Sequence, residues 1–216
     1  ETQHERRALE PTPESRHAVL APIALQLLAW GGEETKSLVW LDPPPDAPYS
    51  QAVSILEQCG AIFKNDAGIH QLTPHGVRLA QMPLHPRLAH MLLVGCDIHA
   101  TETACLLAAI LSERNPLANR GVDILSTIGV LMGQERCPPQ FQSWFKRIWE
   151  QARRYARLAS GIHKPRKYAI TVPQEDMLGV LLASAYPDRV ARCRSGDNRT
   201  DFQLSNGRSA QLPEVD

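Results

Sequence analysis

The strongest constraint on the fold is a succession of helical apolar patterns between residues 84 and 168. Their residues recur every three or four positions, which places them on one face of an α-helix. Each such face must be buried against another layer of structure. The four faces are Leu88, Met91, Leu92 and Gly95; Thr103, Leu106, Leu107, Ile110 and Leu111; Val122, Leu125, Ile128 and Met132; and Phe141, Phe145, Ile148, Ala152, Tyr155 and Ala159. The sequence therefore predicts a helical bundle over residues 84–168.

Residues 15–83 mix helical and strand-like patterns and predict a winged-helix-like unit of about 70 residues. Its first helix is expected to bury Ile23, Leu27 and Trp30, which share one helical face. The expected elements are a helix over 15–30, a strand over 37–41, a helix over 48–60, a hairpin over 61–72 and a helix from Pro74.

The hairpin and the helix after it carry the clearest local signals in this unit. Residues 65–68, Asn-Asp-Ala-Gly, have the composition of a four-residue hairpin loop. The Thr-Pro pair at 73–74 supplies a side-chain N-cap and a proline at the first helical position. The helix that follows is expected to turn Val77, Leu79 and Ala80 inward.

The two ends of the chain differ from these units. Residues 1–14 are polar, contain two prolines and predict a tail or the remnant of a preceding element. Residues 169–216 predict a helix followed by short strands, with the Asn206-Gly207 pair that a two-residue hairpin favours. The expected fold class is mainly α with small β elements: a winged helix, then a helical bundle, then a short C-terminal β element.

Composition narrows the class of protein. No stretch approaches 18 consecutive apolar residues, and the first twenty positions carry charges where a signal peptide needs an apolar run. The five cysteines are odd in number and scattered, which is typical of reduced thiols rather than a disulfide framework. We therefore expect a cytoplasmic protein with no contact to a membrane.

Motifs for catalysis and metal binding are missing from the sequence. It has no glycine-rich phosphate loop ending in Lys-Ser or Lys-Thr, so we expect no nucleotide hydrolysis site, no catalytic residue and no cofactor within these residues. The best metal-ligand set, Cys96, His99 and Cys105, lacks the second ligand pair that structural zinc requires, so we expect no metal. His85 and His90 fall on different helix faces, and His85 is expected to cap a helix start.

Positive charge is concentrated in one segment although the whole chain is neutral. Residues 146–168 contain eight basic residues and one acid, Glu150, a net charge of +7 that the rest of the chain balances. A row of cations can follow a phosphate backbone without reading its sequence. The basic residues are Lys146, Arg147, Arg153, Arg154, Arg157, Lys164, Arg166 and Lys167.

These cations also have an interpretation without a ligand. Glu150 lies three or four positions from Lys146, Arg153 and Arg154, so intrahelical ion pairs on a solvated face would account for some of them. The sequence leaves both interpretations open for each residue, while a single carboxylate is too few to neutralise the whole cluster.

Several segments resemble a known family. Residues 72–93, LTPHGVRLAQMPLHPRLAHMLL, resemble the junction between the winged-helix and ratchet domains of DEAH-box helicases. Four further segments are similar to the bacterial HrpB branch in particular, and they occur in the same order along nearly the whole chain. They are residues 20–31, Trp40–Pro45, Ala185–Arg189 and Leu204–Arg208.

This resemblance implies a parent protein that is an ATP-dependent RNA helicase. The residues would follow its second RecA-like motor domain, and ATP and Mg would bind in those motors, which this sequence lacks. The winged helix would contact the motor domains, and the bundle, called the ratchet domain, would form one side of a channel for single-stranded RNA or DNA. The expected partners are therefore a single nucleic-acid strand and the motor domains of the same parent chain.

The eight cations of residues 146–167 are the expected nucleic-acid contacts, with Arg87 and Arg114 as secondary candidates. Two alternatives remain. In a stand-alone winged-helix regulator, the helix from Pro74 would enter the major groove of DNA, but it offers only His75, Arg78 and Gln81 as polar readers. In a protein-interaction scaffold, the cations would meet an acidic partner.

Overall fold

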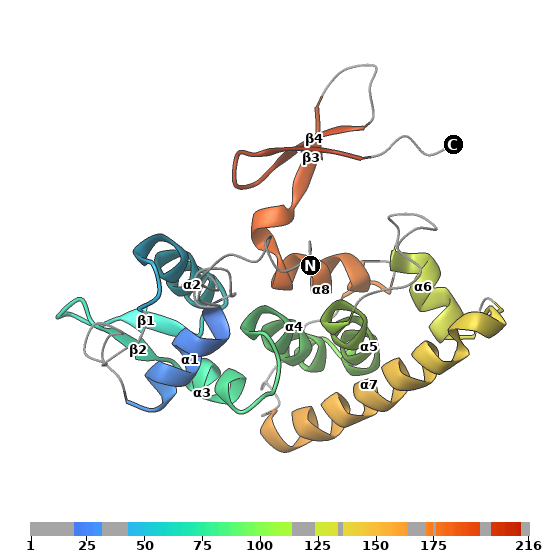
Figure 1. Cartoon of the computed structure of the whole chain (residues 1–216), viewed down its shortest axis with the longest axis horizontal. Helices are drawn as coiled ribbons and strands as arrows, with labels where there is room; N and C mark the ends of the chain where they lie inside the picture. The colour runs from blue at the N-terminus through green and yellow to red at the C-terminus, as the bar shows by residue number, and fades with distance from the viewer. Residues whose placement is uncertain are drawn as a thin grey trace, which may run out of the picture. The chain divides into compact units, whose positions relative to one another are not determined.

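The computed structural model describes residues 20–31, 43–113, 124–133, 136–163, 172–174, 176–194 and 200–212. The chain divides into two compact units, residues 1–80 and 81–216, whose elements are labelled in Figure 1. The predicted fold class, mainly α with small β elements, is confirmed. The predicted tail over residues 1–14 and the predicted strand over residues 37–41 lie outside the described residues.

The first unit contains three helices and one hairpin. The hairpin is antiparallel, with Ile62 opposite Leu72, and the Asn65 side chain accepts hydrogen bonds from the backbone N–H groups of Ala67 and Ile69 inside the turn. The predicted hairpin is thus confirmed. The elements are α1 (Ala21–Ala29), α2 (Asp46–Gln58), β1 (Ile62–Lys64), β2 (His70–Leu72) and α3 (Pro74–Ala80).

Thr73 joins the hairpin to α3. Its hydroxyl accepts a hydrogen bond from the Gly76 N–H at 2.9 Å, which confirms the predicted N-cap. The same hydroxyl donates to the Gly60 carbonyl at 2.6 Å, and the Thr73 N–H donates to the Ala61 carbonyl at 2.9 Å. The start of α3 is therefore locked to the residues that precede β1.

The locked start brings α3 very close to the hairpin. A Cβ atom added at Gly76 would overlap the Ala61 carbonyl, so only glycine fits there. This close approach also sets the rotation of α3. Gly76 and Leu79 are buried, whereas Val77, which we predicted to point inward, is 46% exposed.

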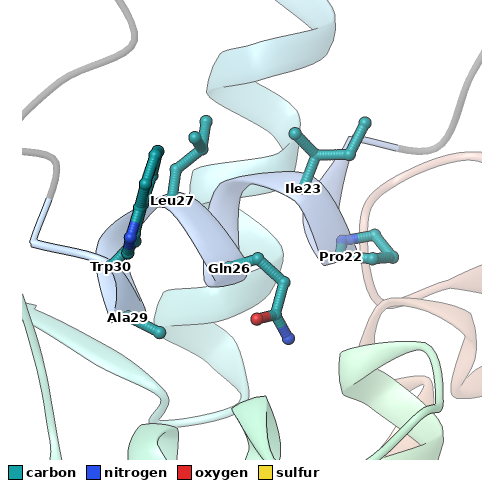
Figure 2. Close-up of a pocket in the computed structure, with 6 residues that line it drawn as sticks. All are labelled: Pro22, Ile23, Gln26, Leu27, Ala29 and Trp30. Atoms are coloured by element: carbon teal, nitrogen blue, oxygen red, sulfur yellow. The ribbon is translucent and has the colours of Figure 1, made fainter.

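The predicted inward face of α1 is wrong. Ile23 is 43% exposed and Trp30 is 85% exposed, and Figure 2 shows both projecting from the same side of the helix as Leu27. The residues that α1 buries are Ala21, Ala24 and Leu25. Apolar residues surround this helix almost completely, so their spacing does not select one face. The small side chains of Ala21 and Ala24 allow α1 to approach α2 closely, and this contact determines which face of α1 is buried.

The second unit is built on packed helices. α5 packs against both α4 and α7, and α8 packs against α4, as Figure 1 shows. The predicted packing of helix on helix is confirmed, and Met91, Leu92 and Ile148 are completely buried. Its helices are α4 (Pro86–Asp97), α5 (Thr101–Ser112), α6 (Ile124–Leu131), η4 (Pro139–Phe141), α7 (Gln142–Ile162), α8 (Met177–Ala185) and η5 (Pro187–Arg189).

The predicted inward face of α6 is wrong in part. Ile128 is buried as expected, but Leu125 is 57% exposed and Met132 is 42% exposed. Thr127 and Leu131 are buried in their place. The short helix is apolar around most of its circumference, so its neighbours rather than its spacing choose the buried side.

The C-terminal segment forms a three-stranded antiparallel sheet with β4 in the centre. The predicted Asn206-Gly207 turn connects β4 to β5, and Gly207 has the positive φ of 83° that favours glycine. Ser205 ties the sheet to η5, because its hydroxyl donates to the Pro187 carbonyl at 2.6 Å. The strands are β3 (Ala191–Cys193), β4 (Asp201–Leu204) and β5 (Ser209–Gln211).

Candidate nucleic-acid interface

The longest of the described helices, α7, carries all five described Lys and Arg residues of the basic segment. Successive residues of a helix are about 100° apart around its axis. On this basis Lys146, Arg153 and Arg157 fall within a narrow arc of the helix surface that faces away from the hydrophobic core of the second unit. The buried residues lie nearly opposite them on the helix. The buried residues of α7 are Trp144, Phe145, Ile148, Ala152, Tyr155 and Ala159.

All five described cations of α7 are exposed, and we call them the cationic stripe. Arg147 has one partner, Glu113 at the end of α5, with 3.8 Å between Nη2 and Oε2. At 57% and 36% side-chain exposure, this pair is screened by water and contributes little stability. The cationic stripe consists of Lys146, Arg147, Arg153, Arg154 and Arg157.

Ion pairing within α7 does not neutralise the cationic stripe. Among the described residues, Glu150 has no ion pair within 4.0 Å with Lys146, Arg153 or Arg154. Lys146, Arg154 and Arg157 likewise have no carboxylate partner among those residues. The interpretation of these cations as an ion-paired face is therefore not supported by the described geometry.

Trp149, which the sequence analysis did not select, borders the cationic stripe. Its indole N–H donates to the Leu131 carbonyl at the end of α6, at 3.2 Å. The Arg153 guanidinium lies over the indole ring, 5.9 Å from its centroid. Trp149 therefore links one stripe residue to the neighbouring helix, a role that depends on the position of α6 and not on any local sequence signal.

A shallow hollow of about 530 Å³ lies along the cationic stripe. Its wall is formed mainly by the aliphatic parts of the lining side chains, which belong to two arginines, one glutamate and one alanine. The lining residues are Glu150, Arg153, Ala156 and Arg157.

Four other residues were predicted to contact nucleic acid. Lys164, Arg166, Lys167 and Arg114 lie outside the described residues. α7 ends at Ile162. The next residue, His163, has its Nε2 3.8 Å from the Asp97 carboxylate at the end of α4, and both side chains are largely buried.

Arg87 occupies a different environment from the one we expected. Its side chain is only 10% exposed, and Nη1 donates to the Asp188 carboxylate at 2.5 Å and to the Ala185 carbonyl at 2.9 Å. The Tyr186 ring lies near two guanidinium groups, those of Arg87 at 5.4 Å and Arg189 at 4.9 Å. Arg87 thus connects α4 to the end of α8, and we do not count it as a nucleic-acid contact.

This ion pair makes the second unit sensitive to acid. Partial burial by itself would raise the pKa of Asp188, but the hydrogen bond and charge of Arg87 outweigh it and hold that pKa below its ordinary value. The pair therefore stabilises the fold above the unfolded-state pKa of about 3.9, and this contribution is lost as the pH falls through the lower folded-state pKa. We expect Asp188→Asn to remove this part of the acid-unfolding profile, measured by circular dichroism; an unchanged profile would contradict it.

His85 caps α4, as predicted. Its Nδ1 accepts a hydrogen bond from the Arg87 N–H at 3.3 Å. Burial, with a smaller contribution from the Arg87 charge, lowers the pKa of His85, which keeps the ring neutral and Nδ1 available as an acceptor.

The described residues offer little other chemistry. They contain no group of three or more metal-ligating side chains, and none of their helices is long and apolar enough to cross a bilayer. Burial raises the pKa of Cys105 to about 12, so its thiol stays protonated at neutral pH.

The helix proposed as a DNA reader in one alternative is poorly suited to that role. α3 is seven residues long, and Arg78 is half-buried with its Nη2 3.2 Å from the His75 Nδ1. The Nε of Arg78 is buried without a hydrogen-bond partner among the described residues. A reader that inserts into a groove needs extended, exposed side chains.

Known proteins resemble this chain over nearly its whole length, although no family model matches it. The ATP-dependent RNA helicase HrpB of Escherichia coli is 29% identical over 214 residues, which is 99% of this chain and 23% of HrpB. The probable ATP-dependent RNA helicase DHX34 of Mus musculus is 30% identical over 116 residues, 54% of this chain and 10% of that protein.

The fold agrees with the sequence comparison. The crystal structure of the Escherichia coli DExH-box NTPase HrpB matches with a TM-score of 0.68 and 26% identity, covering 98% of this chain and 22% of that one. The chain thus spans less than a quarter of the length of these relatives. In sequence and in fold, it is homologous to the C-terminal region of HrpB-type DEAH-box RNA helicases.

Proposed function

We propose that this chain is the accessory C-terminal module of an ATP-dependent RNA helicase and that its cationic stripe lines the path of a single RNA strand. In this proposal ATP and Mg bind in the RecA-like motor domains of the parent protein. Residues 15–83 act as the winged helix that contacts those motors, and the helical bundle of residues 84–168 acts as the ratchet domain.

The observation that supports the proposal is the exposure of the cationic stripe. Three of its members, Lys146, Arg154 and Arg157, have neither a carboxylate nor an aromatic ring as a partner among the described residues, so their charge is available to phosphates. Over the eleven residue steps from Lys146 to Arg157 the helix rises about 16 Å, which is long enough to follow several nucleotides of an extended strand. The homologous proteins are named as RNA helicases, which favours RNA as that strand.

Neutralising the three unpaired cations is expected to weaken the binding of single-stranded RNA. It should also make the remaining affinity less sensitive to salt concentration. Each lost phosphate contact lowers the slope of log K against log salt by about 0.7 for a single strand, so Lys146→Gln, Arg154→Gln and Arg157→Gln together should lower it by about 2. Fluorescence anisotropy with a labelled RNA strand at several salt concentrations measures this slope.

A matched control separates local contact from net charge. Lys64→Gln, Arg192→Gln and Arg208→Gln remove the same total charge from exposed positions on β1, β3 and the β4–β5 turn. We expect the control to keep most of the original slope. Equal slopes in the two triple variants would contradict the proposal, as would tight sequence-specific binding to duplex DNA, which belongs to a winged-helix regulator.

A further inference from the structure

The one carboxylate within the cationic stripe is difficult to explain by phosphate binding alone. Glu150 is exposed and lies among Lys146, Arg153 and Arg157 on the same arc of α7. It forms no ion pair with a described residue, so it does not serve to fix the conformation of a neighbouring cation. Near a phosphate backbone its negative charge would oppose binding.

The hollow beside Glu150 suggests what this carboxylate recognises. Arg153 and Arg157 line the hollow together with Glu150, mainly through their aliphatic stems, so an apolar surface lies beside two guanidinium groups that can bind phosphate and one carboxylate that can accept a hydrogen bond. An ionised carboxylate accepts hydrogen bonds but cannot donate them. Its ligand must therefore present a donor close to a phosphate.

The ribose 2′-hydroxyl is such a donor, and it adjoins the phosphate in every RNA nucleotide. It is also the group by which proteins distinguish RNA from DNA. We propose that the hollow on α7 holds one ribonucleotide, with Arg153 and Arg157 on its phosphates and Glu150 accepting a hydrogen bond from its 2′-hydroxyl. This inference rests on the proposed function and adds that the cationic stripe selects RNA over DNA.

Ala156 provides the space for that nucleotide. Among the described residues that line the hollow it is the one small side chain, so a larger residue there would fill the space without changing any charge. Ala156→Leu is expected to weaken RNA binding several-fold with an unchanged salt slope. Gln151→Leu, on a different side of α7, is the control and is expected to leave binding unchanged.

Two substitutions of Glu150 separate its charge from its hydrogen bond. Both Glu150→Gln and Glu150→Ala remove the negative charge, but only glutamine keeps an acceptor oxygen. The probes are a single strand of uridine nucleotides and the strand of deoxyuridine nucleotides of equal length, which differ only in the 2′-hydroxyl. The measured quantity is the ratio of RNA to DNA affinity for the full chain.

The original protein is expected to prefer RNA. Glu150→Ala should lower the ratio of RNA to DNA affinity by about 10- to 100-fold, the usual size for one hydrogen bond to a charged group. Glu150→Gln should retain part of the preference. Both variants should bind the DNA strand more tightly, because a repulsive charge is gone.

The outcomes distinguish this inference from the proposed function. If the original protein and both variants share one ratio of RNA to DNA affinity, or if both variants lower it equally, Glu150 does not recognise the 2′-hydroxyl and the inference is wrong. The proposed function survives either result, provided that neutralising Lys146, Arg154 and Arg157 still weakens binding. If that triple variant binds both strands as well as the original protein, the proposed function itself fails.

Discussion

Replacing Arg87 by alanine is expected to destabilise the second unit by about 3–5 kcal/mol, the range for breaking a buried ion pair. The Arg87 side chain is 10% exposed and its partner Asp188 is 28% exposed. The substitution leaves the Asp188 carboxylate partly buried without its counter-charge, and the Ala185 carbonyl loses a donor. The packing of the arginine stem is lost as well.

Chemical denaturation followed by circular dichroism measures this effect. Arg154→Ala is the matched control, because this exposed arginine of α7 has no described ion pair, and we expect a change of about 0.5 kcal/mol or less. Adding Asp188→Ala to Arg87→Ala should restore part of the stability, since no unpaired charge then remains. A loss of stability from Arg87→Ala no larger than that of the control would show that this pair does not hold α4 to α8.

Replacing Gly76 by alanine is expected to destabilise the first unit by about 3 kcal/mol, the upper end for overpacking a core. The new methyl group would overlap the Ala61 carbonyl, which is held in place because it accepts a hydrogen bond from the Thr73 N–H. Relief would require α3 to shift from the hairpin, which would weaken the cap made by Thr73 on this helix.

Hydrogen exchange of the amides in β1, β2 and α3 reports the stability of this unit separately from the second one. Gly161→Ala is the control, because a Cβ atom at this α7 position meets nothing within 4 Å. There the substitution should stabilise the helix by up to about 1 kcal/mol, since alanine has the higher helix propensity. Normal protection of α3 in Gly76→Ala would contradict the close packing described here.

Short sequence motifs correctly predicted two turns and the starts of two helices. The Asn65–Gly68 turn, the Thr73 cap, the His85 cap and the Asn206-Gly207 turn all depend on residues within a few positions of one another. Their chemistry is complete within a short segment, so no distant residue is needed to recognise them. Strong one-sided amphipathicity worked nearly as well for α7, because five of its six buried residues were predicted. The sixth, Trp144, was not predicted, and Phe141, which was, ends η4 and is half-buried.

The orientation of the weakly amphipathic helices was not predictable in this way. On α1 the apolar residues Ile23 and Trp30 are exposed, and on α6 Leu125 is exposed, because each helix offers more than one apolar face. Only the neighbouring helices select which face is buried. The choice follows closeness of approach, which alanine and glycine permit and larger side chains prevent.

The amino-acid sequence alone determined the family resemblance, the helices and the concentration of positive charge between residues 146 and 168, because these depend on residue type and spacing. Tertiary structure alone decided which cations are available. Arg87 and the residues of the cationic stripe are equally basic in the sequence, but folding brings Asp188 to Arg87 from 101 positions away and leaves Lys146, Arg154 and Arg157 without a described carboxylate. An ion pair between distant residues exists only once the chain has folded, since the distance between opposite charges sets their attraction.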